Sequence, residues 1–157
     1  MTNHAKIAIP ADAAEAMNRH IEATYPYEAC GAIFGTGDGA GEAWLVTSVE
    51  PAPNEHADDQ HRRYLVSPAF QAEAEMRALQ AGLDVIGWYH SHPDEPAHPS
   101  EYDRAHAWVG YAYLVHSVRA GRATDVNAFT LDAPGGQFGP VAIETAPSTT
   151  TTASPEA

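Results

Sequence analysis

Hydrophobic and polar positions along the chain form short apolar or alternating segments that predict β-strands, separated by longer stretches with helical periodicity. Two strand-like segments flank Gly35–Gly41, a glycine-rich stretch that predicts a hairpin turn. Val85–Tyr89 is mostly apolar, which favours a central strand covered on both faces. The predicted strands are Lys6–Ile9, Ala29–Phe34, Glu42–Val49, Val85–Tyr89, Tyr111–Val118, Val126–Leu131 and Val141–Glu144.

Helices are predicted where apolar residues recur at helical spacing or where helix-boundary residues occur. Met17 and Ile21 share one face of the first helix, and Pro26 ends it. Ser67 is a typical N-cap, it is followed by a proline at the first helical position, and Gly82 ends the helix. The predicted helices are Ala11–Thr24, Ser67–Gly82 and Ser100–Trp108.

The helices interrupt the strands without strict alternation. This order predicts an α/β protein of the α+β type, with a single mixed β-sheet flanked by helices. The structured domain is predicted to span residues 1–146, with the polar segment Glu50–Arg63 as a surface loop. Residues 147–157 are almost all Thr, Ser, Pro and Ala and have little to bury, so we expect them to be a disordered tail.

Candidate metal ligands follow the predicted central strand. His90 and His92 are two residues apart, so an extended backbone points both imidazoles to the same side, about 6 to 7 Å apart along the strand. Asp103 lies in the next helix, after a loop long enough to fold back. Two imidazoles and one carboxylate suit Zn²⁺ and leave a fourth position for water, which is typical of catalytic zinc sites.

Each part of this pattern also has a purely structural interpretation. Ser100 and Asp103 match the Ser-x-x-Asp spacing of a helix-capping box, and capping alone would explain both residues. His90 and His92 could be ordinary strand residues. The order of the two signals, at the end of a predicted strand, favours the metal site, and Ser100 could serve both as a cap and as a catalytic donor.

The segment from His90 to Asp103 resembles the signature of the JAMM (MPN+) zinc metallopeptidases. That signature is His-x-His, seven residues, Ser, two residues and Asp, and His90, His92, Ser100 and Asp103 fill it. The resemblance covers roughly residues 7–131. It implies an MPN/JAMM fold, related to that of the cytidine deaminases, and one Zn²⁺ per chain on His90, His92 and Asp103. It further implies that Glu28 is the general base and proton shuttle and that Ser100 stabilises the oxyanion.

The resemblance is strongest to short prokaryotic members of the family. It implies hydrolysis of a peptide or isopeptide bond after the C-terminal Gly-Gly of a small ubiquitin-like or sulfur-carrier protein. Three alternatives stay open: a catalytically silent MPN-type scaffold, a general small-peptide metallopeptidase, and a thiol peptidase that uses Cys30. His98 and His106 are further candidates for supporting or substrate-binding roles, although the ordinary interpretation is that both are exposed.

Composition restricts the partners and the compartment. The chain has 8 Lys plus Arg against 21 Asp plus Glu, a net charge of −13, which disfavours nucleic acid and anionic membrane as partners. A single cysteine excludes an intrachain disulfide, and no secretory or membrane-spanning pattern is visible. We therefore expect a cytoplasmic protein; the sequence leaves its oligomeric state open.

Overall fold

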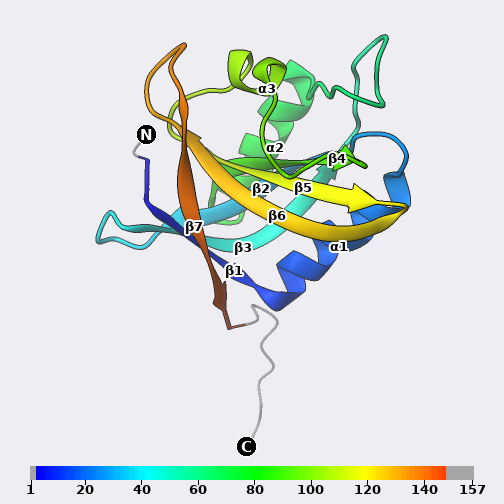
Figure 1. The fold of residues 1–157 in the computed structure, drawn as a ribbon. Coiled ribbons are helices and arrows are strands. Elements are labelled where there is room, and N and C mark those ends of the chain that lie inside the picture. The colour runs from blue at the N-terminus through cyan, green and yellow to red at the C-terminus, as the bar shows by residue number, and fades with distance from the viewer. Residues whose placement is uncertain (1–2, 148–157) are drawn as a thin grey trace, which may run out of the picture.

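The computed structural model describes residues 3–147, which fold into seven strands and three helices (Figure 1). Most elements lie where the sequence predicts them. The strands are β1 (Lys6–Pro10), β2 (Cys30–Gly37), β3 (Ala43–Ala52), β4 (Asp84–Pro93), β5 (Ala112–Arg119), β6 (Arg122–Leu131) and β7 (Phe138–Ala146). The helices are α1 (Ala11–Thr24), α2 (Pro68–Gln80) and α3 (Glu101–Ala105).

The seven strands form one mixed sheet that closes on itself as a barrel in the order β1-β3-β2-β4-β5-β6-β7. β1 pairs in parallel with both β3 and β7, and β4 pairs in parallel with β5. The remaining pairs are antiparallel. The prediction of a single mixed sheet is thus confirmed, whereas the closure of that sheet was not predicted. The relation to the cytidine deaminases stays a prediction.

The barrel interior is an apolar core to which all seven strands contribute. Every strand contributes at least one residue to this core, and two of these residues, Ile33 on β2 and Leu114 on β5, are fully buried. α1 packs its apolar face, formed by Ala13, Met17 and Ile21, against the same core. The periodicity that predicts α1 therefore also identifies the side that it buries.

The outer face of β2 and β4 is covered by α2. Trp88 on β4 and Cys30 on β2 pack there against Ala74 and Ala78 of α2. Because side chains alternate along a strand, His90 and His92 lie on the same face of β4 as Trp88. The two histidines are therefore on the outer wall of the barrel, the wall that α2 covers. α2 and α3 lie on the same side of the sheet (Figure 1).

Several predicted boundaries need correction, and one prediction falls outside the described range. β4 continues past Tyr89 to Pro93, because it pairs with β5 up to that residue, so His90 and His92 lie within the strand and not in a loop after it. β6 and β7 also begin earlier than predicted. Glu50–Ala52 is not part of a loop but continues β3, because it pairs with β2 up to Cys30. α3 is shorter than predicted and ends at Ala105, with His106 as its C-cap. The predicted disordered tail lies, apart from Pro147, outside the described residues.

No helix within residues 3–147 is long and apolar enough to cross a membrane.

Candidate metal centre and active site

β4 places His90 and His92 side by side at its carboxyl end. The strand pairs with β2 as far as His90 and with β5 as far as Pro93, so the backbone that carries both rings is held firmly. Both side chains are buried, and their Nε2 atoms lie 3.1 Å apart. The strand alternation therefore does what the sequence predicts: it directs both imidazoles to one point.

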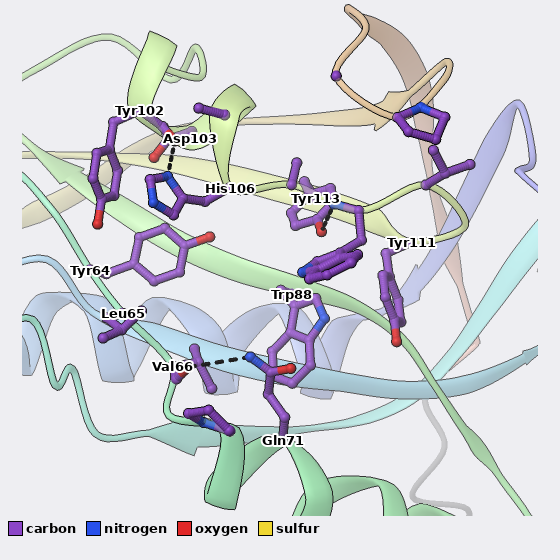
Figure 2. Close-up of a pocket in the computed structure, with 17 residues that line it drawn as sticks. Tyr64, Leu65, Val66, Gln71, Trp88, Tyr102, Asp103, His106, Tyr111 and Tyr113 are labelled. Atoms are coloured by element: carbon purple, nitrogen blue, oxygen red, sulfur yellow. Dashed lines mark hydrogen bonds between the residues drawn. The ribbon is translucent and has the colours of Figure 1, made fainter.

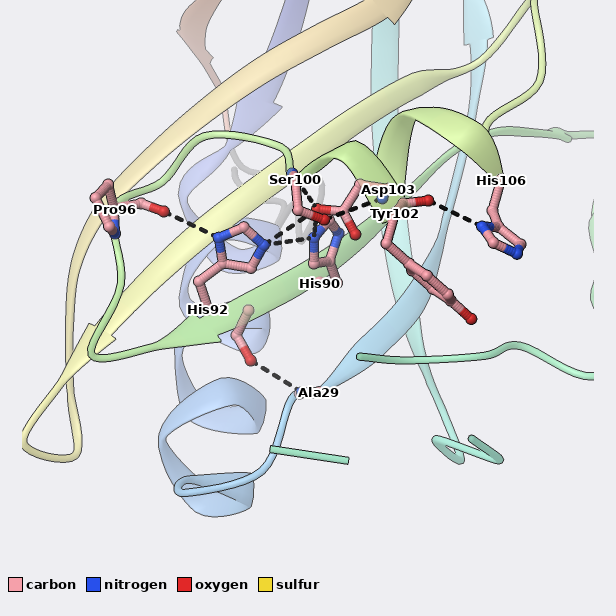
Figure 3. A network of polar contacts seen from close by, with 9 residues as sticks. Ala29, His90, His92, Pro96, Ser100, Tyr102, Asp103 and His106 are labelled. Carbon is pink, nitrogen blue, oxygen red and sulfur yellow. Dashed lines mark hydrogen bonds and ion pairs between the residues drawn. The ribbon is translucent and has the colours of Figure 1, made fainter. Parts of the chain in front are cut away.

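Asp103 reaches the same point from α3. Its Oδ2 lies 3.1 Å from His90 Nε2 and 3.2 Å from His92 Nε2 (Figure 3). The same oxygen accepts a hydrogen bond from the Ser100 amide at 2.8 Å, and the Ser100 hydroxyl accepts one from the Asp103 amide at 3.0 Å. The capping box is therefore present, and the carboxylate that forms it also faces both histidines. Helix capping and a place at the candidate metal site are therefore both compatible with Asp103.

The three converging atoms fit a bound zinc ion. Ligand atoms that bind zinc tetrahedrally at about 2.0 to 2.1 Å lie about 3.3 to 3.4 Å apart. The observed separations of 3.1 to 3.2 Å are close to that value. His92 Nδ1 lies 2.9 Å from the carbonyl oxygen of Pro96, a contact that requires the proton on Nδ1 and leaves Nε2 free as a ligand.

Glu28 adds a second carboxyl group to this cluster. It is only 3% exposed, and one of its oxygens lies within 4.8 Å of a ring nitrogen of both His90 and His92. Oε1 is buried without a hydrogen-bond partner among residues 3–147. Buried polar atoms are rarely left unpaired in native proteins, so an unpaired oxygen beside metal-type ligands indicates a site for an ion, water or substrate.

The ionisation of the two carboxyl groups differs because their surroundings differ. Burial raises the pKa of Glu28 to about 8; Asp103 and Asp59 add to this effect, and His92 opposes it. Burial acts in the same direction on Asp103, but the neighbouring His90 and His92 and the Ser100 amide outweigh it and lower the pKa of Asp103. Asp103 is therefore an anion at neutral pH, whereas the charge of Glu28 responds to its neighbours.

The chain also contains supporting residues that the sequence alone did not single out. The Ser91 hydroxyl accepts a hydrogen bond from the Ala29 amide at 2.9 Å, and the Ser91 amide donates to the Ala29 carbonyl at 3.0 Å. These bonds hold the segment after Glu28 against β4. The Tyr64 ring stacks on His90, with ring centroids 4.4 Å apart. The position of Ser91 between the two histidines could have indicated that it supports them. Nothing in the sequence indicated that Tyr64 would stack on His90.

A groove of about 850 Å³ begins at Asp103 and runs along the outer face of the barrel (Figure 2). Its walls are mainly aromatic and apolar, with α3 on one side and the segment leading into α2 on the other. Trp108 at its rim is 67% exposed. The labelled lining residues are Tyr64, Leu65, Val66, Gln71, Trp88, Tyr102, Asp103, His106, Tyr111 and Tyr113. An apolar chain segment could thus be held next to the candidate metal ligands.

The remaining candidates lie outside the His–Asp–Glu cluster. His98 is exposed, and its nearest ring contact is with Phe129. His106 bonds through Nδ1 to the carbonyl of Tyr102 and lines the groove. Cys30 is fully buried, and burial raises the pKa of its thiol to about 12. A thiol with these properties is poorly suited to be a nucleophile at neutral pH.

Replacing Cys30 with serine is therefore expected to change any peptidase activity by only a few-fold. A strong chelator should abolish that activity, and added zinc should restore it. Activity assays and metal analysis of the same preparations test this expectation. A serine variant that loses its activity but keeps its zinc would support a thiol mechanism.

Comparisons with known proteins agree with this description. Residues 10–132 match the family described as prokaryotic homologs of the JAB domain. The desampylase of Haloferax volcanii is 32% identical over 117 residues, covering 71% of this chain and 81% of that protein. A histone deubiquitinase of Branchiostoma floridae is 34% identical over 87 residues, covering 55% of this chain but only 10% of that protein.

Solved structures share the fold. A protein of Desulfitobacterium hafniense superposes with a TM-score of 0.74 at 25% identity, covering 90% of this chain and 94% of the other. A protein of Salinibacter ruber superposes with a TM-score of 0.68 at 32% identity, covering 90% and 91%.

The closed barrel, together with the buried cluster of His90, His92, Asp103 and Glu28, defines the class of protein: a barrel with a site that can hold a divalent metal. The family match covers most of the chain, and the chain belongs to the prokaryotic JAB-domain family. The resemblance to the JAMM group that the sequence indicates is thereby confirmed.

Proposed function

We propose that this protein is a zinc-dependent peptidase that cleaves the bond after the C-terminal Gly-Gly of a small ubiquitin-like or sulfur-carrier protein. The observation that carries the proposal is the convergence of His90, His92 and Asp103, whose three facing atoms lie 3.1 to 3.2 Å apart. Beside them is Glu28, whose Oε1 has no hydrogen-bond partner within residues 3–147. A silent scaffold would have no need for a buried carboxyl of this kind.

His90, His92 and Asp103 would hold one zinc ion per chain. When bound, zinc polarises a scissile carbonyl and makes water acidic enough to act as a nucleophile near neutral pH. Glu28 accepts the proton of the attacking water and passes it to the leaving amine. Ser100 is exposed, and its hydroxyl oxygen accepts a hydrogen bond from the Asp103 amide. The hydroxyl hydrogen is not used in that bond, so it can be donated to the oxyanion.

The choice of substrate is supported by the shape of the site. His90 and His92 are only 2% and 8% exposed, so a chain with bulky side chains at the scissile bond could not come close to them. Glycine lets a backbone approach such a recessed site closely. The apolar groove that starts at Asp103 can hold the extended segment leading to the cleaved bond. The names desampylase and deubiquitinase of two relatives agree with a small protein modifier as the substrate.

Three substrates of one carrier protein test this proposal. The first carries Gly-Gly followed by one extra residue, the second is joined through Gly-Gly to a lysine, and the third has Ala-Ala in place of Gly-Gly. Mass spectrometry should show release directly after Gly-Gly from the first, the second or both. The Ala-Ala carrier should be cut at least about tenfold more slowly, because the recessed site excludes its methyl groups.

Two outcomes would contradict the proposal. Cleavage of unrelated unfolded peptides with the carriers left intact would indicate a general peptidase. Intact carriers and peptides, with zinc bound, would indicate a binding module.

A further inference from the structure

The main chain of Glu28 is held by a loop that is remote from it in sequence. The Glu28 amide donates a hydrogen bond to the carbonyl of Gln60 at 2.7 Å. The Glu28 carbonyl accepts one from Asn54 Nδ2 at 3.1 Å. Both polar main-chain groups of Glu28 are thus bonded to the loop between β3 and α2, a segment that the sequence predicts only as a polar surface loop.

Asn54 is the centre of that loop. Besides Glu28, its Nδ2 donates to the carbonyl of Arg63 at 3.0 Å. Its Oδ1 accepts from the amides of His56 at 3.0 Å and Leu65 at 3.1 Å. The Asn54 side chain therefore connects the two ends of the loop to each other and to Glu28. Both hydrogens of its Nδ2 and both acceptor positions of its Oδ1 are used.

The same loop also contacts the other side of the metal cluster. Arg63 lies over the ring of Tyr102, 4.7 Å from its centroid, next to Asp103 on α3. Tyr64 stacks on His90. The loop consequently spans from the Glu28 segment to the elements that carry His90 and Asp103.

We propose that Asn54 is a positioning residue for Glu28. This inference rests on the proposed function, because it assigns to Asn54 the task of aiming the general base. The Glu28 carboxyl has an oxygen without any hydrogen-bond partner among the described residues, so the direction of the side chain depends on where its backbone is held. Displacing a catalytic group by about 1 Å can cost about a hundredfold in rate.

A double-mutant cycle tests this role. Asn54→Ala should lower kcat about tenfold to a hundredfold, because it releases the segment that carries Glu28. KM should change by a smaller factor, because the variant also loses the bond to the Leu65 amide, and Leu65 lines the proposed substrate groove. Zinc content should stay at the wild-type level, since the Asn54 side chain bonds to main-chain groups of Glu28 and of its own loop and not to the proposed ligands His90, His92 and Asp103. In a Glu28→Gln background the same substitution should change the rate by less than about twofold, because the base that Asn54 aims is already absent. Asn18→Ala, an exposed asparagine on α1, is the matched control.

A second variant and a second measurement keep the test independent of folding and of activity. Asn54→Asp retains the oxygen that accepts from the amides of His56 and Leu65 but lacks the donor to the carbonyls of Glu28 and Arg63, so it should reproduce the loss of kcat if Asn54→Ala is unstable. Hydrogen exchange of the Glu28 amide, bonded to Gln60, should become at least about tenfold faster in either variant.

The outcomes separate this inference from the proposed function. Equal losses of rate in the wild-type and Glu28→Gln backgrounds, a rise in KM alone, or unchanged exchange at Glu28 would each overturn the role of Asn54. A wild-type protein that cuts no carrier would instead overturn the proposed function, while hydrogen exchange at Glu28 would still decide whether Asn54 holds that segment.

Discussion

Glu28→Gln is expected to lower turnover by about a hundredfold to ten-thousandfold while the protein keeps its zinc. Glutamine has nearly the size of glutamate but cannot accept the proton of the attacking water. General-base catalysis typically accelerates a reaction by about a hundredfold to ten-thousandfold, so its loss should lower the rate by that factor. The atoms of His90, His92 and Asp103 that we propose as zinc ligands are untouched by the change. Steady-state kinetics and metal analysis of the same preparation give both quantities.

Glu15→Gln is the matched control for this substitution. Glu15 is an exposed glutamate on α1, so its replacement makes the same chemical substitution without touching the site. It should leave turnover within about twofold of the wild type. A Glu28→Gln protein with near-normal rates would mean that another group accepts the proton.

Alanine at His90 or His92 is expected to weaken zinc binding by more than about a hundredfold and to abolish activity. Loss of a residue that merely supports a ligand typically costs about 10- to 100-fold in metal affinity, and loss of a ligand should cost more. Competition with a chelating dye measures the affinity directly.

Two further variants show whether the effect belongs to the metal ligands. His98→Ala removes an exposed histidine from the neighbouring loop and should leave zinc affinity unchanged. Ser100→Ala should reduce turnover but retain zinc, because Ser100 contacts Asp103 through the capping box and is not a proposed ligand. Equal zinc affinity in the His92→Ala and His98→Ala proteins would contradict the ligand assignment.

The convergence of His90, His92 and Asp103 could be predicted from the sequence because it depends on local geometry. Strand alternation directs two histidines at i and i+2 to one side, and the capping box fixes the Asp103 carboxylate at the start of a short helix. The nearness of Glu28 could not be derived in this way. It came from the family resemblance, because the pairing of β2 with β4 joins segments about sixty residues apart.

Neither barrel closure nor the role of the loop between β3 and α2, which contains Asn54, could be predicted from the sequence, and the reasons are related. Closure requires parallel pairing of β1 with β7, at opposite ends of the chain, and no local pattern encodes that contact. The loop has the polar composition of a solvated segment, yet its polar groups bind one another and the main chain of Glu28. Composition indicates hydrogen-bonding capacity but not the partner that uses it.

A zinc titration shows whether one zinc ion bound to His90, His92 and Asp103 makes the protein a peptidase. Metal-free protein receives zinc in steps while cleavage of a carrier extended beyond Gly-Gly is followed. If zinc on this cluster is responsible for cleavage, the rate should be negligible without metal and should rise linearly until one zinc per chain is bound. Full cleavage by the metal-free protein, or no cleavage after one equivalent of zinc has bound, would contradict it.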